Sequence, residues 1–197
     1  MVDLKLAVLI SGRGSNLQAL IDACSRGDFP AGIVLVISNK PDAQGLARAR
    51  TAKIPALTID RRDHGDREAF DEALSQTISA HDADLVCLAG FMAILGNKFV
   101  ARWRGRLINI HPSLLPAYPG LDTHARAIAA GESTAGCTVH HVTAEVDSGP
   151  IILQETVPVE PDDTEETLGL RVLAVEHRLY PQAVRLIAEE GSKRPAL

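Results

Sequence analysis

Two polar side chains, Asn109 and His111, stand at the end of a short apolar run. If residues 107–110 form a β-strand, side chains two positions apart face the same side, so these two would project together. An asparagine amide can donate a hydrogen bond to a developing oxyanion, and a histidine can act as a donor, acid or base near neutral pH. An isolated histidine at a strand end is most often structural, but the paired asparagine and the stiffening prolines Pro112 and Pro116 favour a chemical role.

A second candidate lies between His140 and Pro150. His140 and His141 are adjacent, so on a strand they face opposite sides and cannot both enter one site. Asp147 stands in a tight Asp-Ser-Gly-Pro segment, from which its carboxylate could reach a histidine of another segment and favour the charged imidazole. Asp147 could equally serve only to shape the turn. Both interpretations stay open on these residues alone.

The third candidate is the segment 11–16, Ser-Gly-Arg-Gly-Ser-Asn, which joins an apolar run to a helix-like pattern. Its glycines permit a tight turn and a close approach to a ligand. Free N–H groups at a helix start favour a phosphate, to which Ser15 and Asn16 would add hydrogen bonds. The spacing is neither a Walker A loop nor a dinucleotide fingerprint, because residue 17 is Leu. The alternative is a tight turn with a serine N-cap, but the place after the first strand favours phosphate binding.

Two other kinds of site are disfavoured by the spacing of the same residue types. A metal site would have to combine His111, His124, His140 and Asp147, yet the chain has no His-x-His or His-Glu-x-x-His pattern. A serine hydrolase would need a Gly-x-Ser-x-Gly elbow, which is absent from the sequence. We therefore expect a site without a metal and without a serine nucleophile.

The segments that would position these residues alternate between strand-like and helix-like patterns in the first half of the chain. Such alternation indicates right-handed crossovers and a parallel sheet, and near-continuous Val, Ile and Leu suit strands covered on both faces. We predict an α/β fold with a Rossmann-like, mostly parallel twisted sheet and helices on both faces. The expected strands are 5–10, 33–37, 56–59, 85–89 and 107–110, and the expected helices are 16–24, one ending near 52, and 67–80.

After residue 111 the pattern changes. A proline-rich loop (112–120) and a short helix (123–130) precede two strands (137–142 and 151–157), which are expected to pair as an antiparallel extension around the Asp147 turn. Asp163 and Glu166 have the spacing of a capping box at the start of a long final helix. We expect that helix to bend or break near Pro181. The prediction is one domain, 1–197, with a phosphate-binding half (1–111) and a second half (112–197) of loop, extra strands and final helix.

Composition limits the partners of the chain. Its 197 residues carry a formal net charge of −5, with 46% hydrophobic and 23% charged residues, as in ordinary globular proteins rather than binders of nucleic acid or membranes. Cys24, Cys87 and Cys137 lie far apart, which argues against disulfides and suits a reducing cytoplasm. The amino terminus lacks the pattern of a signal peptide, and no apolar run is long enough to span a bilayer.

Taken together, the segments resemble the phosphoribosylglycinamide formyltransferases, a family of folate-dependent enzymes of purine synthesis. The resemblance runs from Leu9 to about Pro181. It is carried, in order, by LISGRGSNLQAL, LAGFMAIL, INIHPSLLPAYPG, TVHHVTAEVDSGPII and VEHRLYP. Each piece alone is common, whereas the combination is specific.

The resemblance implies two small-molecule substrates, 5-phosphoribosylglycinamide and 10-formyltetrahydrofolate, the second as a co-substrate. It implies catalytic roles for Asn109, His111 and Asp147, with His140 nearby. The phosphoribosyl end would be held by Gly14, Ser15, Asn16 and Glu176. The folate would lie against Arg67, Met92, Ala93, Ile94, Leu95 and Asn109, under a loop of Thr143, Ala144, Glu145, Val146 and Asp147.

The mechanism that the resemblance implies is direct transfer, in which the acceptor amine attacks the formyl carbon. Asn109 and protonated His111 would stabilise the negative charge on the formyl oxygen, while Asp147 would favour the charged histidine and pass protons through a water. One position departs from the family pattern, because Ala93 stands where Phe-Met-Arg-Ile-Leu has its arginine. A side-chain contact to the folate tail would therefore be missing, while backbone reading of the pterin ring would remain.

Other functions are less consistent with the sequence. Methionyl-tRNA formyltransferases share the His-Pro-Ser-Leu-Leu-Pro stretch but carry an RNA-binding domain, for which this chain has neither the length nor a basic patch. Formyltetrahydrofolate hydrolases place a regulatory domain before the catalytic one, whereas this chain begins with the first strand. A non-catalytic nucleotide-binding module would use the Gly14 loop but leave the combination of Asn109, His111 and Asp147 unexplained.

Overall fold

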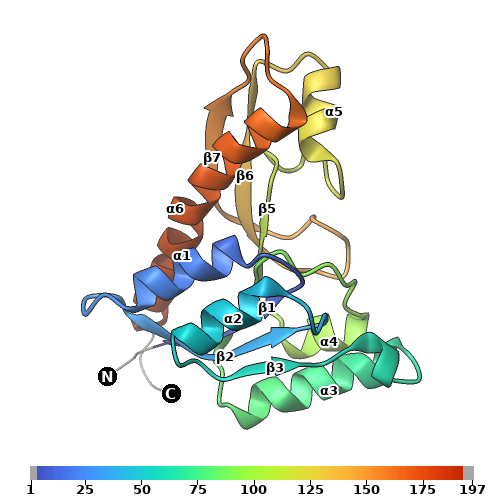
Figure 1. The fold of residues 1–197 in the computed structure, drawn as a ribbon, viewed down its shortest axis with the longest axis vertical. Helices are drawn as coiled ribbons and strands as arrows, with labels where there is room; N and C mark the ends of the chain where they lie inside the picture. The colour runs from blue at the N-terminus through green and yellow to red at the C-terminus, as the bar shows by residue number, and fades with distance from the viewer. Residues whose placement is uncertain (1–3, 193–197) are drawn as a thin grey trace.

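A seven-stranded sheet forms the framework of the computed structural model, which describes residues 4–192 (Figure 1). The strands in it are β1 (Leu4–Ile10), β2 (Ala31–Ser38), β3 (Ala56–Thr58), β4 (Leu85–Leu88), β5 (Leu107–His111), β6 (Thr134–His141) and β7 (Ile151–Pro158). Their order is β3-β2-β1-β4-β5-β6-β7. Neighbours among β1 to β5 run parallel, and β6 and β7 add on as antiparallel strands. The predicted α/β fold is confirmed.

The helices in the described part of the chain are α1 (Ser15–Cys24), α2 (Gln44–Thr51), α3 (Arg67–Ala80), α4 (Asn97–Arg102), α5 (Thr123–Ala129) and α6 (Glu165–Ser192), with a short 3-10 turn, η1 (Arg61–Asp63). None of these helices is long and apolar enough to cross a membrane. The amino-terminal pattern that argues against a signal peptide falls partly on residues 1–3, which lie outside the described residues.

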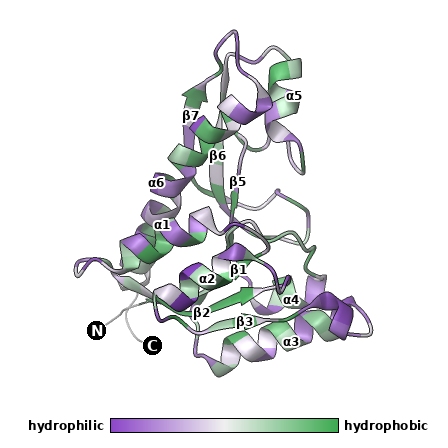
Figure 2. Ribbon diagram, viewed as in Figure 1, coloured by the Kyte–Doolittle hydropathy of each residue, from purple (hydrophilic) through white to green (hydrophobic). Residues whose placement is uncertain are grey.

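Alternating side chains of the parallel strands enter two separate apolar clusters. In β1, Leu6, Val8 and Ile10 face one cluster, which α1, α2 and α6 cover. Ala7 and Leu9 face the other, which α3 and α4 cover with residues such as Phe70 and Trp103. Helices therefore lie on both faces, and the strands between them are continuously hydrophobic, as Figure 2 shows for β2.

The chain direction across the sheet reverses between β1 and β4. The path from β1 leads outward to β2 and β3, and α3 then returns it to the other side of β1. Such a reversal opens a crevice at the carboxyl ends of the two central strands, where open α/β sheets bind ligands. Figure 1 shows β5 to β7 and α5 extending away from the body formed around β1 to β4, while α6 runs along both parts.

The structure shows no break at Pro181 in the final helix and a different capping residue from the one expected. Helix α6 continues through Pro181 without a break, because Tyr180, Ala183 and Val184, on either side of the proline, are fully buried in the same cluster and hold both segments on the sheet. Its cap is also one residue later than predicted. The hydroxyl of Thr164, rather than the Asp163 carboxylate, accepts the Thr167 N–H at 3.2 Å.

Most predicted boundaries agree with the structure to within a few residues, and the helix over 67–80 agrees at both ends. The sequence interpretation missed α4 and η1. Helix α4 has six residues and contributes Phe99 and Val100 to the core, too few turns for a helical period to stand out.

Candidate functional site

Asn109 and His111 occupy the carboxyl end of β5, between β4 and β6. Residue 109 is opposite His140 in the antiparallel pairing with β6. The Asn109 Nδ2 atom lies 3.3 Å from His140 Nε2, so this register brings a second imidazole to the site. The predicted pair is assembled here, and β6 supplies the neighbour.

The His111 ring is held from both sides. Its Nε2 atom lies 3.0 Å from the Tyr118 carbonyl oxygen, which can only accept a hydrogen bond, so Nε2 carries a proton. Its Nδ1 atom lies 3.4 Å from the Asp147 carboxylate. With Nε2 committed to Tyr118, Nδ1 forms an ion pair with Asp147 only when the ring is an imidazolium. The ring is therefore fixed by a carbonyl oxygen on one side and a carboxylate on the other.

The loop that presents Tyr118 to His111 is fixed by Thr138, a fully buried residue of β6. The Thr138 hydroxyl donates to the Ser113 carbonyl at 2.6 Å and accepts the Leu115 N–H at 3.1 Å. The Ser113 hydroxyl in turn donates to the Ala117 carbonyl at 2.7 Å. These bonds close the proline-rich segment into a rigid turn.

His140 orients the asparagine. Its Nδ1 atom lies 3.0 Å from the His141 carbonyl oxygen and must carry the proton of the neutral ring. The Nε2 atom then has a lone pair that accepts one Asn109 N–H. The second N–H of the same amide remains able to donate to an oxyanion.

Asp147 lies between the two histidines. Its other oxygen is 3.6 Å from His140 Nε2, and its Oδ2 accepts the Gly120 N–H at 2.9 Å. The residue adopts a left-handed conformation, with φ of 51°. Two residues later, a Cβ at Gly149 would stand 1.7 Å from the His141 carbonyl oxygen, so only glycine allows this loop to return so closely along β6.

The charge balance at Asp147 favours the ionised carboxylate. Burial raises its pKa, but the contact with His140, the hydrogen bond from the Gly120 N–H and the nearby His111 ring together outweigh burial and lower the pKa below its ordinary value of 3.8. A permanent negative charge therefore lies beside His111 and His140.

The glycine loop after β1 also has the predicted form. Gly14 has φ of 71°, and a Cβ there would stand 2.7 Å from the Cα of Gly45, which is the second residue of α2. Helix α1 begins at Ser15 with no side-chain cap, so the alternative of a serine N-cap is wrong. The N–H groups of the first turn have no acceptor within the helix and face the crevice at the end of β1.

Asn16 and Glu176, 160 positions apart, meet beneath this loop. The Asn16 Nδ2 atom donates to Glu176 Oε2 at 2.7 Å, while the buried Oδ1 of Asn16 has no partner within residues 4–192. Burial raises the pKa of Glu176 to about 7, against which the Asn16 hydrogen bond acts only partly. A buried carboxyl and a spare amide oxygen are thus available to hydroxyl groups of a ligand.

The segment 92–95, which follows β4, presents an apolar surface. Met92 and Ile94 are 66% and 68% exposed, whereas Ala93, Leu95 and Val142, from which the 143–147 loop departs, each pack against the same core cluster. Arg67, the first residue of α3, lies beside Gly96 at the end of this segment. The structure thus brings together the residues proposed to border the folate. The carboxylate, alanine and valine side chains of 144–146 are exposed.

Several contacts in this region could not be predicted from the sequence. Ser11 accepts the Met92 N–H at 2.7 Å and donates to Asn39 Oδ1 at 2.5 Å, and so connects the loops after β1, β2 and β4. Tyr118 and Gly120 act through backbone atoms, which a residue type does not reveal.

Two other histidines stay outside the site: His141 faces away from it, and His124 packs against Gly169 of α6. Within residues 4–192, no three side chains of His, Cys, Asp or Glu are arranged to hold a metal ion.

The fold agrees with the comparisons to known proteins. A family described as formyl transferase matches residues 4–184, and the chain belongs to that family. Among curated relatives, the phosphoribosylglycinamide formyltransferase of Haemophilus influenzae is 48% identical over 94% of this chain and 87% of its own length. The solved glycinamide ribonucleotide transformylase 1 of Symbiobacterium toebii is 51% identical, with a TM-score of 0.93 over 95% of this chain and 88% of that one.

A longer relative contains the same region as a part. The trifunctional purine biosynthetic protein adenosine-3 of Drosophila melanogaster is 52% identical over 93% of this chain, which spans 14% of that protein. The matched region is therefore a unit that also occurs within multifunctional proteins.

Proposed function

We propose that this protein transfers the formyl group of 10-formyltetrahydrofolate to the amine of 5-phosphoribosylglycinamide in purine biosynthesis. The observation that carries the proposal is the cluster of contacting side chains Asn109, His111, His140 and Asp147. It lies at the crevice between the glycine loop after β1, which is suited to a phosphate, and the exposed apolar segment 92–95. Membership of the formyl transferase family and the names of the similar proteins support it. The free thiols of Cys24, Cys87 and Cys137 suit a reducing cytoplasm.

The acceptor would bind at the glycine loop. Its phosphate would lie on the first-turn N–H groups of α1 near Gly14 and Ser15. Asn16 and Glu176 would contact its ribose, because the buried carboxyl and the unpartnered amide oxygen offer both an acceptor and a partner for hydroxyl groups. In this pose the glycinamide amine would lie toward the end of β5.

The folate would bind on the other side of the site. The exposed apolar side chains of Met92, Ile94 and Val146 fit a flat ring system, and backbone groups of 92–95 and 143–147 would read the edge of the pterin. Arg67 would lie near the carboxylate tail. The family pattern has a second arginine for that tail at position 93, where this chain has Ala93. Arg67 would therefore be the arginine proposed to contact the tail.

In the chemical step the acceptor amine would form a bond to the formyl carbon, and the bond from that carbon to the folate nitrogen would break. Negative charge develops on the formyl oxygen before the break. The free N–H of Asn109 and the charged His111 would stabilise it in a partly buried site, where such donors are most effective. Asp147 would keep the imidazolium in place and help to move the amine proton to the leaving nitrogen.

An assay with both substrates tests the proposal. Consumption of 10-formyltetrahydrofolate should require 5-phosphoribosylglycinamide and yield equal amounts of formylated product. Consumption without an acceptor would indicate a hydrolase instead, and a chain that binds no folate would indicate a non-catalytic module.

The role of Asn109 can be tested by substitution. Asn109→Ala removes one oxyanion donor, a change worth about 3 kcal/mol, and should lower kcat about a hundredfold or more. Asn97→Ala, at the exposed start of α4, serves as the control and should keep the wild-type kcat. Full turnover by Asn109→Ala would exclude this asparagine as the oxyanion donor.

A further inference from the structure

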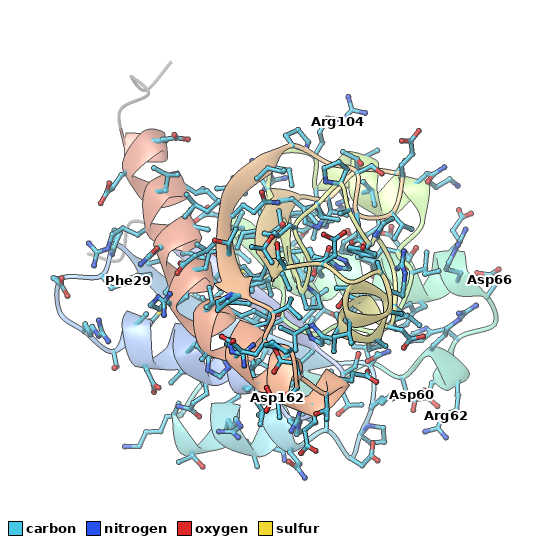
Figure 3. All side chains as sticks on the ribbon, turned by 90° about the horizontal axis from the view of Figure 1, so that it is seen from above. Phe29, Asp60, Arg62, Asp66, Arg104 and Asp162 are labelled. Atoms are coloured by element: carbon cyan, nitrogen blue, oxygen red, sulfur yellow. The ribbon has the colours of Figure 1, made fainter. Side chains whose placement is uncertain are left out.

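Outside the candidate site, a groove of about 540 Å³ runs between α1 and α6. Its size lies in the range of small-molecule sites. Figure 3 shows Phe29, which lines one end, on the flank where α1 and α6 run side by side. The groove begins at Ser15 and extends along the outer side of α1, away from the crevice above β4 and β5.

The groove is positively charged in a chain whose net charge is −5. Its lining contains four arginines (Arg26, Arg48, Arg178 and Arg185) and one carboxylate, Asp22. Arg178 pairs with Glu155 and Arg185 with Asp28, and neither of these carboxylates lines the groove. Arg26 and Arg48 form no ion pair within residues 4–192. The cations therefore outnumber the anions at this surface, which attracts an anionic ligand.

One end of the groove is suited to a phosphate. Arg48 is held in place there, because its Nε donates to the Arg13 carbonyl at 2.9 Å and its Nη1 to Gln18 at 3.2 Å. His177 lies at the same end with a buried Nε2 that has no partner in the described part of the chain. Burial and the charge of Arg48 lower the pKa of His177. A phosphate would supply the missing negative charge and a hydrogen-bond partner.

The other end is suited to a flat organic group. The Arg185 guanidinium lies over the Phe29 ring, 5.1 Å from its centre, and its plane offers a stacking surface for a flat group. From His177 to Arg185, α6 advances about 12 Å at 1.5 Å per residue, which separates the two ends by more than a phosphate alone would need.

We propose that the groove between α1 and α6 binds a phosphate monoester attached to a planar ring system, as in a nucleoside 5′-monophosphate. The phosphate lies against Arg48, Arg178 and His177, and the ring stacks on the Arg185 guanidinium beside Phe29. The groove adjoins the proposed acceptor site at Ser15 but extends away from it, because the neighbouring Glu176 faces inward to Asn16 while His177 faces the groove. The inference goes beyond the proposed function, since formyl transfer does not require a ligand here.

Calorimetric titration of the full-length protein tests the proposal with three probes: adenosine 5′-monophosphate, ribose 5-phosphate and adenosine. We expect adenosine 5′-monophosphate to bind at least about tenfold more tightly than either of the other two, because only it fills both ends. Equal binding of ribose 5-phosphate would remove the role of the ring. Undetectable binding of all three at millimolar concentration would overturn the proposal.

Substitutions locate the binding. Arg26→Gln combined with Arg178→Gln should weaken adenosine 5′-monophosphate at least about tenfold, and Arg104→Gln, on the distant part of the surface in Figure 3, should not. Arg48 is left intact because it also holds the Arg13 carbonyl. By NMR, the pKa of His177 should rise when the probe binds. Unchanged affinity in the double variant would contradict the proposed location.

Competition and activity separate the two proposals. Saturating 5-phosphoribosylglycinamide should not displace adenosine 5′-monophosphate, and displacement would assign the probe to the acceptor site and refute a separate groove. Formyl transfer is measured on the same preparations. Activity without probe binding defeats only the groove, whereas probe binding without activity defeats only the proposed transfer reaction.

Discussion

At the scale of single residues, the chemistry of the site depends on the charge of Asp147. Its carboxylate is shared between His111, His140 and the Gly120 N–H. The carbonyl partners of the two rings are neutral, so the carboxylate is the group that supplies negative charge beside them. The orientation of His111 and the charge of Asp147 are therefore expected to act together.

Asp147→Asn tests this arrangement. The amide oxygen can still accept the Gly120 N–H, so the loop should keep its shape while the charge is lost. We expect kcat/KM for formyl transfer to fall about a hundredfold or more. Asp162→Asn, in the exposed turn before α6, is the matched control. A variant at position 147 with wild-type kcat/KM would show that the charge is not needed.

Glu176 carries a raised pKa, so its effect on stability has a definite sign. Between its ordinary value of 4.5 and about 7, the unfolded chain loses this proton while the folded chain keeps it. The unfolded state is therefore favoured progressively as pH rises through that range, and the folded protein loses stability there.

Glu176→Gln should remove this loss while keeping an acceptor for Asn16. Unfolding in urea should show the variant to be about 2–3 kcal/mol more stable than wild type at pH 8, with the difference vanishing near pH 4. Its KM for the ribotide should rise, because the carboxyl is proposed to contact the ribose. Glu166→Gln, exposed on the first turn of α6, is the control. An equal stability difference at both pH values would rule out titration of Glu176 as the cause.

At the scale of elements, the 143–150 loop depends on a single glycine. Gly149→Ala would place a Cβ 1.7 Å from the His141 carbonyl, so the loop must move and take Asp147 with it. We expect kcat to fall at least about tenfold, since small displacements of catalytic groups have large effects, while circular dichroism stays unchanged. Gly27→Ala, whose Cβ meets nothing within 4 Å, should be silent in the same assay. Normal kcat in Gly149→Ala would mean that Asp147 tolerates the shift.

The sequence predicted the elements whose hydrophobic pattern continues over many residues or whose ends are clearly marked. The α3 helix shows apolar residues at helical spacing over 14 residues, and both predicted ends agree with the structure. Pro181 was misleading, because the packing of Tyr180 and Val184 on the sheet is a tertiary effect that local preference does not contain. The same holds for the backbone contacts of Tyr118 and Gly120, whereas strand periodicity predicted that Asn109 and His111 lie at the end of one strand.

At the scale of the whole molecule, the two predicted halves share one core. The cluster around Leu6 and Val8 of β1 is completed by Leu168, Val172 and Tyr180 of α6. The Tyr180 hydroxyl also donates to the Leu88 carbonyl at 2.9 Å. A chain that stops after β5 would leave this apolar face of the central strands in water.

A fragment of residues 1–111 should therefore not fold alone, although it contains all the parallel strands. We expect a loss of cooperative thermal unfolding and poorly dispersed NMR amide signals, whereas the full-length protein should unfold in one transition. A fragment that melts cooperatively would instead define the first half as an independent domain.

The Ser11 hydroxyl, which joins the Met92 N–H to Asn39, lies between the loop proposed for the ribotide and the segment proposed for the folate. Because one hydroxyl orders both, each ligand would find its own loop partly organised by the other. Thermodynamic linkage makes such an effect reciprocal: the factor by which the ribotide strengthens folate binding equals the factor by which folate strengthens ribotide binding. The two substrates would then act as each other's effectors through a single side chain.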